Sequence, residues 1–325
     1  MDAPVLILTA KSRSHSVETG RAIRGENYAN QRLLESILNS PKLRETIKKG
    51  WSGLTLDRLE ELIDKVPATQ EKLKDLAYQR RARVISITKG HNPGEILTRG
   101  AAEEDPGVIK ERVERVDNLM QGVERVHITS SLGTDLWLEV RPDKKAMEDG
   151  DVSQPGKISN FPFGEWSCSL RWEGSFGTLV VDGAIGGGIN KDKLGEPVKL
   201  SIEQGRVIKI EGGEAADLMK VYLDSDDSTR GDPYKVAELG IGVNSRACEG
   251  KPDKDWGSTE TEKKLGTVHV GVGSNGSFGV KEGDPYYNGA RIHCDIVLIE
   301  GVNLEGIKKD GSSIKLIENG HTIGY

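Results

Sequence analysis

The sequence predicts an α/β N-terminal part followed by a mainly antiparallel β, or α+β, C-terminal domain. In the first half, short apolar runs alternate with stretches of helical periodicity. In the second half, alternating apolar and polar stretches are separated by turn dipeptides, and glycines concentrate after residue 164. The polar segment MEDGDVSQPG at 147–156 is typical of a linker between two domains. We therefore expect a reduced α/β domain over 1–150 and a β-rich, metal-binding catalytic domain over 151–325.

The N-terminal part contains strand and helix signals in turn. VLILT at 5–9 and RVISIT at 83–88 are short apolar runs typical of buried strands. Between them, LDRLEELIDKV at 56–66 places its apolar residues on one helical face. The same periodicity predicts a helix over 108–124, followed by strands at 124–129 and 134–140.

The C-terminal part is dominated by strand signals. Gln204-Gly205 and Asp310-Gly311 are predicted hairpin turns. One helix is expected at 214–225, and the segments 245–265 and 274–290 are expected to be loops of functional importance. The predicted strands are 177–183, 198–203, 206–211, 240–244, 267–273 and 290–300.

Composition narrows the class of protein. A content of 35% apolar and 30% charged residues suits a globular chain with a sizeable core, and a net charge of −6 argues against nucleic acid as a partner. No apolar run approaches the roughly 20 residues that a membrane span needs, and no signal peptide is evident. Three widely spaced cysteines fit a reducing compartment. We expect a cytoplasmic protein without membrane or nucleic-acid partners.

The stretch ARIHCDIVLIE at 290–300 has polar residues inside an apolar strand. Side chains at i and i+2 of a strand share a face, so His293 and Asp295 point one way and Cys294 the other. The pair reads either as two metal ligands or as a histidine held by its carboxylate neighbour. Cys294 reads as a small core residue.

Three further residues sit in similar settings. His269, in LGTVHVGVG, shares its face with Gly271 and Gly273, which leaves open space for a ligand. Glu165 follows a Pro-x-Gly turn and enters an alternating stretch. Glu238 lies among apolar residues, where an acid is costly to bury unless it is paired or bound to a cation.

Together, Glu165, Glu238, His269, His293 and Asp295 are oxygen and nitrogen donors that suit zinc, manganese, cobalt or iron(II). Five such residues exceed the needs of one catalytic zinc and are enough for two divalent ions. A water between two ions loses its proton near neutral pH and attacks a carbonyl. The structural alternatives are that Glu165 caps a turn and that Glu238 pairs with Arg246 or Lys235.

Five motifs, in this order, resemble the M29 family of thermophilic-type metalloaminopeptidases, in particular its short leucyl aminopeptidase and aminopeptidase T-like members. The resemblance covers about half of the chain, from residue 127 to beyond Asp295. The motifs are NFPFGEW (160–166), VVDGAIGG (180–187), AELGIGVN (237–244), LGTVHVGVGSN (265–275) and RIHCDIVL (291–298).

The resemblance implies a homodimeric hydrolase that removes N-terminal residues from peptides with two Zn, Co or Mn ions. The family's metal ligands match Glu165, Glu238, His269, His293 and Asp295. Within that scheme Glu165 bridges the ions, and Glu238 is the expected proton shuttle. Gly276 stands where larger members carry a tyrosine, which Tyr286 or Tyr287 would have to replace.

Two departures leave other functions open. Trp166 follows Glu165 where a small aliphatic residue is expected, which predicts a narrowed pocket, and the N-terminal half matches the family less well. The same fold branch includes ring-cleaving dioxygenases of dihydroxypyridines, in which two histidines and one aspartate hold a single iron(II). His269, His293 and Asp295 supply that set. A third alternative is a specialised or non-catalytic peptide-binding member of a peptide-maturation pathway.

Overall fold

The computed structural model describes residues 5–9, 81–87, 99–186, 189, 194–226, 228–250 and 257–325. The chain divides into two compact units, one of residues 1–95 with 150–161 and one of residues 96–149 with 162–325. The predicted division into domains of residues 1–150 and 151–325, with the roles assigned to them, stays a prediction, and the helix predicted at 56–66 lies outside the described residues.

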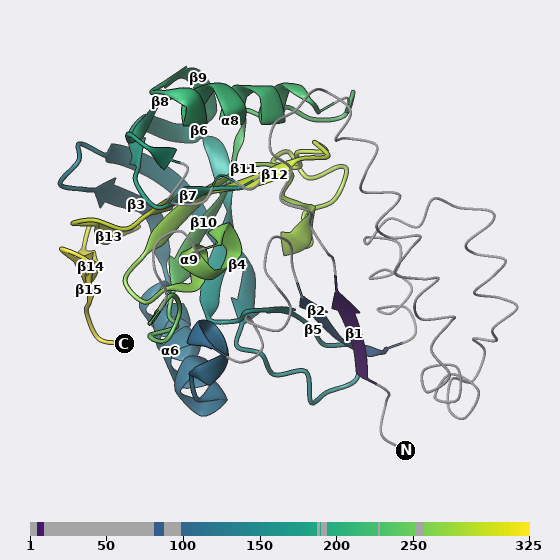
Figure 1. Cartoon of the computed structure of the whole chain (residues 1–325). Coiled ribbons are helices and arrows are strands. Elements are labelled where there is room, and N and C mark those ends of the chain that lie inside the picture. Colours follow the sequence, from purple (N-terminus) through teal and green to yellow (C-terminus); the bar gives the residue numbers. More distant parts are fainter. Residues whose placement is uncertain are drawn as a thin grey trace, which may run out of the picture. The chain divides into compact units, whose positions relative to one another are not determined.

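The first unit contains a small parallel sheet. Its strands are β1 (Val5–Thr9), β2 (Arg83–Ile87) and β5 (Ile158–Phe161), with β2 in the middle (Figure 1). Both pairings are parallel. The strand expected at 5–9 is confirmed, and that expected at 83–88 is confirmed over 83–87, since residue 88 lies outside the described residues. The sequence gives β5 no signal that separates it from the polar segment before it.

The second unit is built on a 12-stranded sheet, ordered β15-β14-β13-β3-β4-β6-β10-β11-β12-β7, with β8 and β9 branching from β6. All of its strand pairings are antiparallel, which confirms the predicted fold class. The strands are β3 (Val123–Thr129), β4 (Asp135–Glu148), β6 (Glu165–Val181), β7 (Ala184–Ile185), β8 (Val198–Glu203), β9 (Arg206–Glu211), β10 (Val236–Gly242), β11 (Val268–Gly273), β12 (His293–Leu298), β13 (Asn303–Lys308), β14 (Ser313–Glu318) and β15 (His321–Thr322).

Strand β6 is the branch point of this sheet. It is 17 residues long, and its residues 165–171 and 176–178 pair with β4 on one side. On the other side, residues 165–169 pair with β10 and residues 177–181 pair with β8. The sequence predicts only its second part, at 177–183, because the first part is rich in Ser and Glu. Both predicted hairpin turns form, with positive φ angles at Gln204 and Gly311.

Helices pack against this sheet at several places (Figure 1). Helix α6 (Pro106–Leu119) begins at Asp105, whose Oδ1 accepts from the Gly107 amide at 2.7 Å. Its buried residues Ile109, Val113 and Val116 join the core beside β4 and β6. Helix α8 (Glu214–Asp224), which confirms the predicted helix, lies along β8 and β9.

The predicted loops are only partly loops. Within 245–265 the chain forms a short helix, α9 (Ser258–Lys263), beside β10 and β12. Its polar sequence STETEK gives no amphipathic signal, yet Glu260, Thr261, Glu262 and Lys263 are all buried. The segment 274–290 contains a single 3-10 turn, η4 (Gly276–Phe278), and is otherwise irregular, as expected.

Alternation along β6, β10, β11 and β12 separates two faces of the sheet. One face is apolar and contributes to the core through Trp166, Cys168, Leu239, Ile241, Val268, Val270, Val272, Cys294 and Ile296. Trp166 is fully buried there, and its Nε1 donates to Asp117 of α6 at 2.9 Å. The expectation that Trp166 narrows a pocket beside Glu165 is therefore wrong, because consecutive strand residues point to opposite faces.

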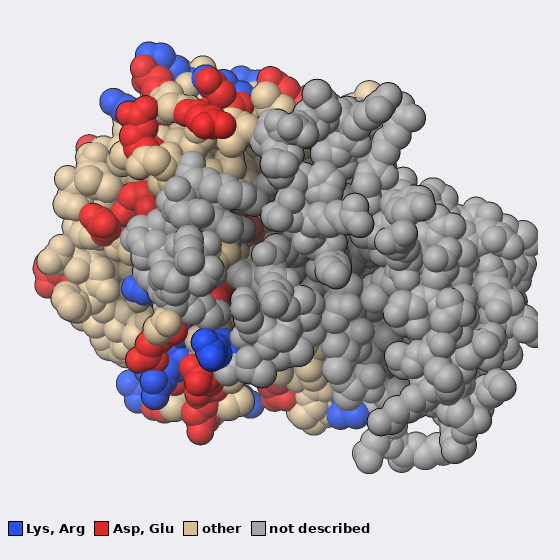
Figure 2. Space-filling view, in the orientation of Figure 1, with Lys and Arg blue, Asp and Glu red and all other residues tan. Residues whose placement is uncertain are grey.

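Lys and Arg side chains lie among Asp and Glu side chains on the described part of the face in Figure 2. This mixture agrees with the small net charge of −6. Among the described helices, we find none with the length and apolar character required to cross a membrane.

Candidate metal centre

The predicted ligands meet on the other face of the same four strands. Glu165 begins β6, Glu238 lies in β10, His269 in β11, and His293 and Asp295 in β12. The register sets them close together. Glu238 is opposite Gly271, which in turn is opposite Asp295, and Gly240 is opposite His269. Antiparallel partners point to the same face, so side chains from four segments of the chain converge.

Two glycines provide the space for this convergence. A Cβ atom on Gly240 would come within 2.0 Å of Nε2 of His269, so the imidazole lies directly over this glycine. A Cβ on Gly271 would lie 2.8 Å from Cβ of Glu238 and 2.9 Å from Cε1 of His293. The space predicted beside His269 is not open, because Glu238 and His293 occupy it.

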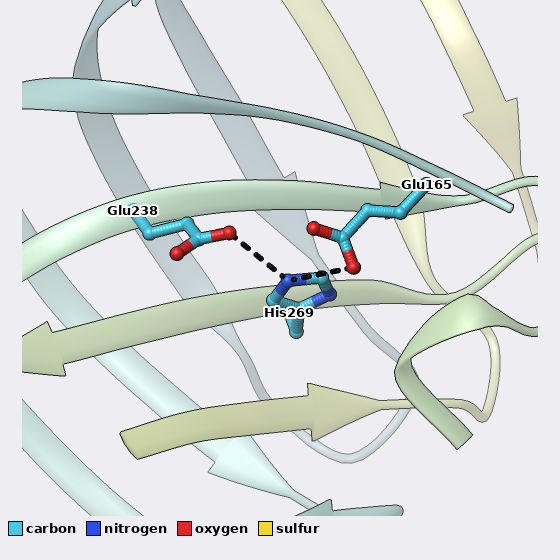
Figure 3. Close-up of side chains that lie close together, drawn as sticks. All are labelled: Glu165, Glu238 and His269. Atoms are coloured by element: carbon cyan, nitrogen blue, oxygen red, sulfur yellow. Dashed lines mark ion pairs between the residues drawn. The ribbon is translucent and has the colours of Figure 1, made fainter. Parts of the chain in front are cut away.

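The five side chains form two groups that share Glu238. Nε2 of His269 lies 3.5 Å from Oε1 of Glu238 and 3.7 Å from Oε2 of Glu165, so the two carboxylates flank the ring (Figure 3). Nε2 of His293 lies 2.8 Å from Oε2 of Glu238 and 2.9 Å from Oδ1 of Asp295. Donor atoms within each group lie close enough for a shared metal ion.

His293 is oriented as a metal ligand is. Nδ1 of His293 lies 2.6 Å from the carbonyl oxygen of Ser274, to which it donates, so Nε2 is the ring nitrogen that faces the carboxylates and binds a metal ion once its proton is lost. His269 is 1% exposed, and its Nδ1 has no hydrogen-bond partner among the described residues. A buried ring nitrogen without a partner is costly. A cation held by the Nε2 atoms and the carboxylate oxygens fits the orientation of His293, whereas the unpartnered nitrogen of His269 is Nδ1 and not the Nε2 that faces the carboxylates.

The charges of the cluster are strongly coupled. Burial disfavours the charged form of Glu238, but His293 and His269 outweigh this and hold the pKa of Glu238 well below its ordinary value. For Glu262 burial dominates over the attraction of Lys263 and raises its pKa to about 8. Burial opposes protonation of His269, yet Glu165 and Glu238 raise its pKa to about 10.

Three residues of the cluster were not predicted from the sequence. Lys263 of α9 is 3% exposed and contacts Glu165, Glu148 and Glu262. In the sequence, Glu262 and Lys263 belong to a charge run, TETEKK, which is typical of a solvated surface. The available signal was position, because this run directly precedes the Gly-Thr-x-His motif that contains His269.

Side chains near the cluster have other partners. His127 of β3 contacts Asp135 at 2.7 Å and stacks on Trp137. Glu238 contacts the two histidines, whereas Arg246 pairs with Glu249. Cys294 is a core residue as expected.

The tyrosine that would replace the one missing at Gly276 is not identified. The ring of Tyr286 lies in a T-shaped contact with Trp172, and Arg141 stands over it at 5.2 Å. Arg141 also binds Asp284 through both carboxylate oxygens, at 3.0 and 2.9 Å. Tyr286 is thus part of the packing that holds the segment 274–290.

Two solved structures resemble this chain in fold. A 2,5-dihydroxypyridine dioxygenase from Pseudomonas putida KT2440 is 19% identical, with a TM-score of 0.60, and the match covers 99% of this chain and 92% of that one. Wild-type AmpT from Thermus thermophilus is 14% identical, with a TM-score of 0.54, and the match covers 99% of this chain and 94% of that one. The predicted relationship to the M29 aminopeptidases is thereby supported at the level of fold. A comparison with curated proteins gave no match.

The family comparison corrects the predicted activity. Residues 63–298, well over half of the chain, match the family described as NicX: 2,5-dihydroxypyridine 5,6-dioxygenase. The prediction of an M29-like metallo-aminopeptidase, a two-metal peptide hydrolase, is therefore wrong. It failed because structures of both kinds resemble this fold, and a set of Glu, His and Asp donors suits both a two-metal hydrolase and an iron(II) oxygenase. On this match, the chain belongs to the NicX, 2,5-dihydroxypyridine 5,6-dioxygenase, family.

Proposed function

We propose that this protein is an iron(II)-dependent dioxygenase that opens a dihydroxylated pyridine ring. The family match over residues 63–298 is the observation that carries the proposal. The cluster supports it, because two histidines and one carboxylate are the ligand set of non-haem iron(II) oxygenases. In the cluster, His269, His293 and Asp295 would hold the ion. When bound, iron(II) supplies the electron transfer that allows dioxygen to react with an electron-rich ring.

The protein's own residues prepare this site. The Ser274 carbonyl fixes the tautomer of His293, and Gly240 and Gly271 fix the positions of His269 and of the β12 ligands. Glu238 lies between both imidazoles, 3.5 and 2.8 Å from their Nε2 atoms, and orients them. As an ionised carboxylate on the site, Glu238 is also the group placed to accept a proton from a ring hydroxyl.

The reaction needs no further reductant. Both atoms of dioxygen enter the product as one ring carbon–carbon bond breaks, so one dioxygen is consumed for each ring opened. Of the two other functions considered, peptide hydrolysis is contradicted by the family match. The peptide-binding role in a maturation pathway stays an untested prediction.

The proposal is tested with protein purified under anaerobic conditions and loaded with iron(II). We expect dioxygen uptake to equal the loss of 2,5-dihydroxypyridine absorbance, and 18O from labelled dioxygen to appear twice in the product. His293→Ala and Asp295→Ala should lose both bound iron and activity. Aminoacyl anilides with zinc, cobalt or manganese should not be hydrolysed. Iron-loaded, folded protein that consumes no dioxygen with any dihydroxypyridine or dihydroxybenzene would overturn the proposal.

A further inference from the structure

Lys263 is a buried cation inside the acidic cluster. It is the last residue of α9, and 3% of it is exposed. A buried ammonium group is costly unless several partners compensate its charge. Here three carboxylates compensate it, from β4, β6 and α9. The buried positive charge therefore depends on contacts between separate parts of the chain.

The surroundings of the ammonium resemble those of a bound metal ion. Nζ lies 2.9 Å from Oε2 of Glu148 and 3.0 Å from Oε1 of Glu262, and it also contacts Oε2 of Glu165. Glu148 and Glu165 are register partners on β4 and β6, so the sheet itself fixes their separation. Hard oxygen donors that converge in this way are the usual environment of a divalent cation.

Glu165 links this position to the imidazole of His269. The same oxygen of Glu165 that contacts Lys263 lies 3.7 Å from Nε2 of His269. A carboxylate that bridged two metal ions would have to hold the second ion on the side where the ammonium lies. The ammonium already neutralises that oxygen and repels a dication that approaches it.

We propose that Lys263 takes the place of a second metal ion and thereby restricts this centre to one. In that arrangement Glu165 is the partner of an internal cation and not a bridging ligand, and the single metal ion is held by the proposed set His269, His293 and Asp295, beside Glu238. The inference rests on the proposed metal centre, but it does not depend on which reaction the centre performs.

The inference is tested by counting the metal ions that the protein binds, with metals that do not support the dioxygenase reaction. This keeps the test separate from activity. The protein is titrated with Mn²⁺ or Zn²⁺ and its stoichiometry is measured by calorimetry and elemental analysis. We expect one ion per chain in the wild type and two in Lys263→Met, which removes the charge but keeps an apolar stem of similar length. In the Mn²⁺ form of this variant, the electron paramagnetic resonance spectrum should show two spin-coupled ions, which would distinguish an adjacent site from a remote one.

Matched variants identify the cause. Lys263→Arg keeps the positive charge and should remain at one ion per chain. Lys263→Met combined with Glu165→Gln should return from two ions to one, because the carboxylate that would bridge them is gone. A wild type that binds two coupled ions, or a folded Lys263→Met protein that binds one, would overturn the inference. If Lys263→Met fails to fold, the same metal stoichiometry is measured for the wild type and for Lys263→Gln, and the same outcomes support or overturn the inference.

The two proposals fail in different ways. A wild type with one metal ion but without dioxygen uptake would contradict the dioxygenase and leave the role of Lys263 standing. A wild type that binds two coupled metal ions and has dioxygenase activity would contradict the role of Lys263 and leave the dioxygenase proposal standing.

Discussion

The imidazole of His269 lies across Gly240 of the neighbouring strand, where a Cβ atom would be 2.0 Å from its Nε2. The two residues are register partners on β10 and β11. The ring can therefore lie flat against the sheet and reach the carboxylates of Glu165 and Glu238 on either side (Figure 3). The position of one candidate ligand thus depends on the absence of a side chain on the adjacent strand.

Gly240→Ala should displace His269 and weaken metal binding. We expect a loss of about 10-fold or more in affinity for iron(II), the size seen when a residue that orients a ligand is changed. Calorimetric titration with a divalent metal measures it. Gly276→Ala is the matched control, because a Cβ there would meet only Oγ of Ser274, at 3.9 Å, and its affinity should be unchanged. Equal affinities in the two variants would contradict this account of Gly240.

Glu238→Gln tests the shared carboxylate. Glutamine has the same shape but lacks the charge that attracts a cation and orients both imidazoles at 3.5 and 2.8 Å. We expect metal affinity to fall about 10- to 100-fold, with the fold retained. Glu173→Gln, at an exposed position of β6, removes one negative charge from the surface and should not change the affinity. If both variants bind metal like the wild type, Glu238 has no role at the centre.

Metal affinity should rise with pH. His269 and His293 must be neutral to bind a metal ion, but their carboxylate neighbours raise the pKa of both, that of His269 to about 10. Because protons compete with the metal up to this higher range, binding should strengthen as pH increases from 6 to 9, with release of protons. Calorimetry in buffers of different ionisation enthalpy measures the proton count. Binding that is independent of pH would mean that these imidazoles are not the ligands.

Asn275 should contribute strongly to the stability of the segment that carries Ser274. Asn275 is fully buried. Its Nδ2 donates to the Tyr286 carbonyl at 2.6 Å, and its Oδ1 accepts from the Asn288 amide at 2.9 Å. Asn275→Ala leaves these backbone groups unsatisfied, and we expect the free energy of unfolding to fall by about 1–3 kcal/mol.

Urea denaturation followed by circular dichroism measures that change. Asn118→Ala, at an exposed position of α6, is the control and should change the free energy of unfolding by less than about 0.5 kcal/mol. A similar small change for Asn275→Ala would show that water replaces the lost hydrogen bonds. Because Ser274 accepts from His293, a destabilised segment should also lower metal affinity.

Much of the second unit follows from local sequence. The strands of β8, β9 and β11 and the helix α8 have the period of their structure, and the turns at Gln204-Gly205 and Asp310-Gly311 carry residues that accept positive φ. Strand alternation also placed His293 and Asp295 on one face and Cys294 on the other. These features are readable because they depend on neighbours within a few residues.

Other elements were missed because their environment is set by distant segments. The sequence of the first part of β6 is polar and gives no strand signal. In the structure its serines and Glu165 face the cluster, while Trp166 and Cys168 face the core. Helix α9 reads as a charged loop, but Glu260 accepts from the amides of Ala101 and Cys248, at 3.0 and 3.1 Å. Nothing within six residues reveals such partners.

Strand periodicity and residue chemistry are local properties, so the fold class and the five candidate donors Glu165, Glu238, His269, His293 and Asp295 could be predicted from the sequence. How these side chains are grouped depends on the pairing of remote strands. Only the pairing of β4, β6, β10, β11 and β12 with one another, and the packing of α9 against β10 and β12, bring Lys263 among Glu148, Glu165 and Glu262. Charge compensation in a buried site depends on distances between remote segments, and these distances are not encoded in any single stretch of the chain.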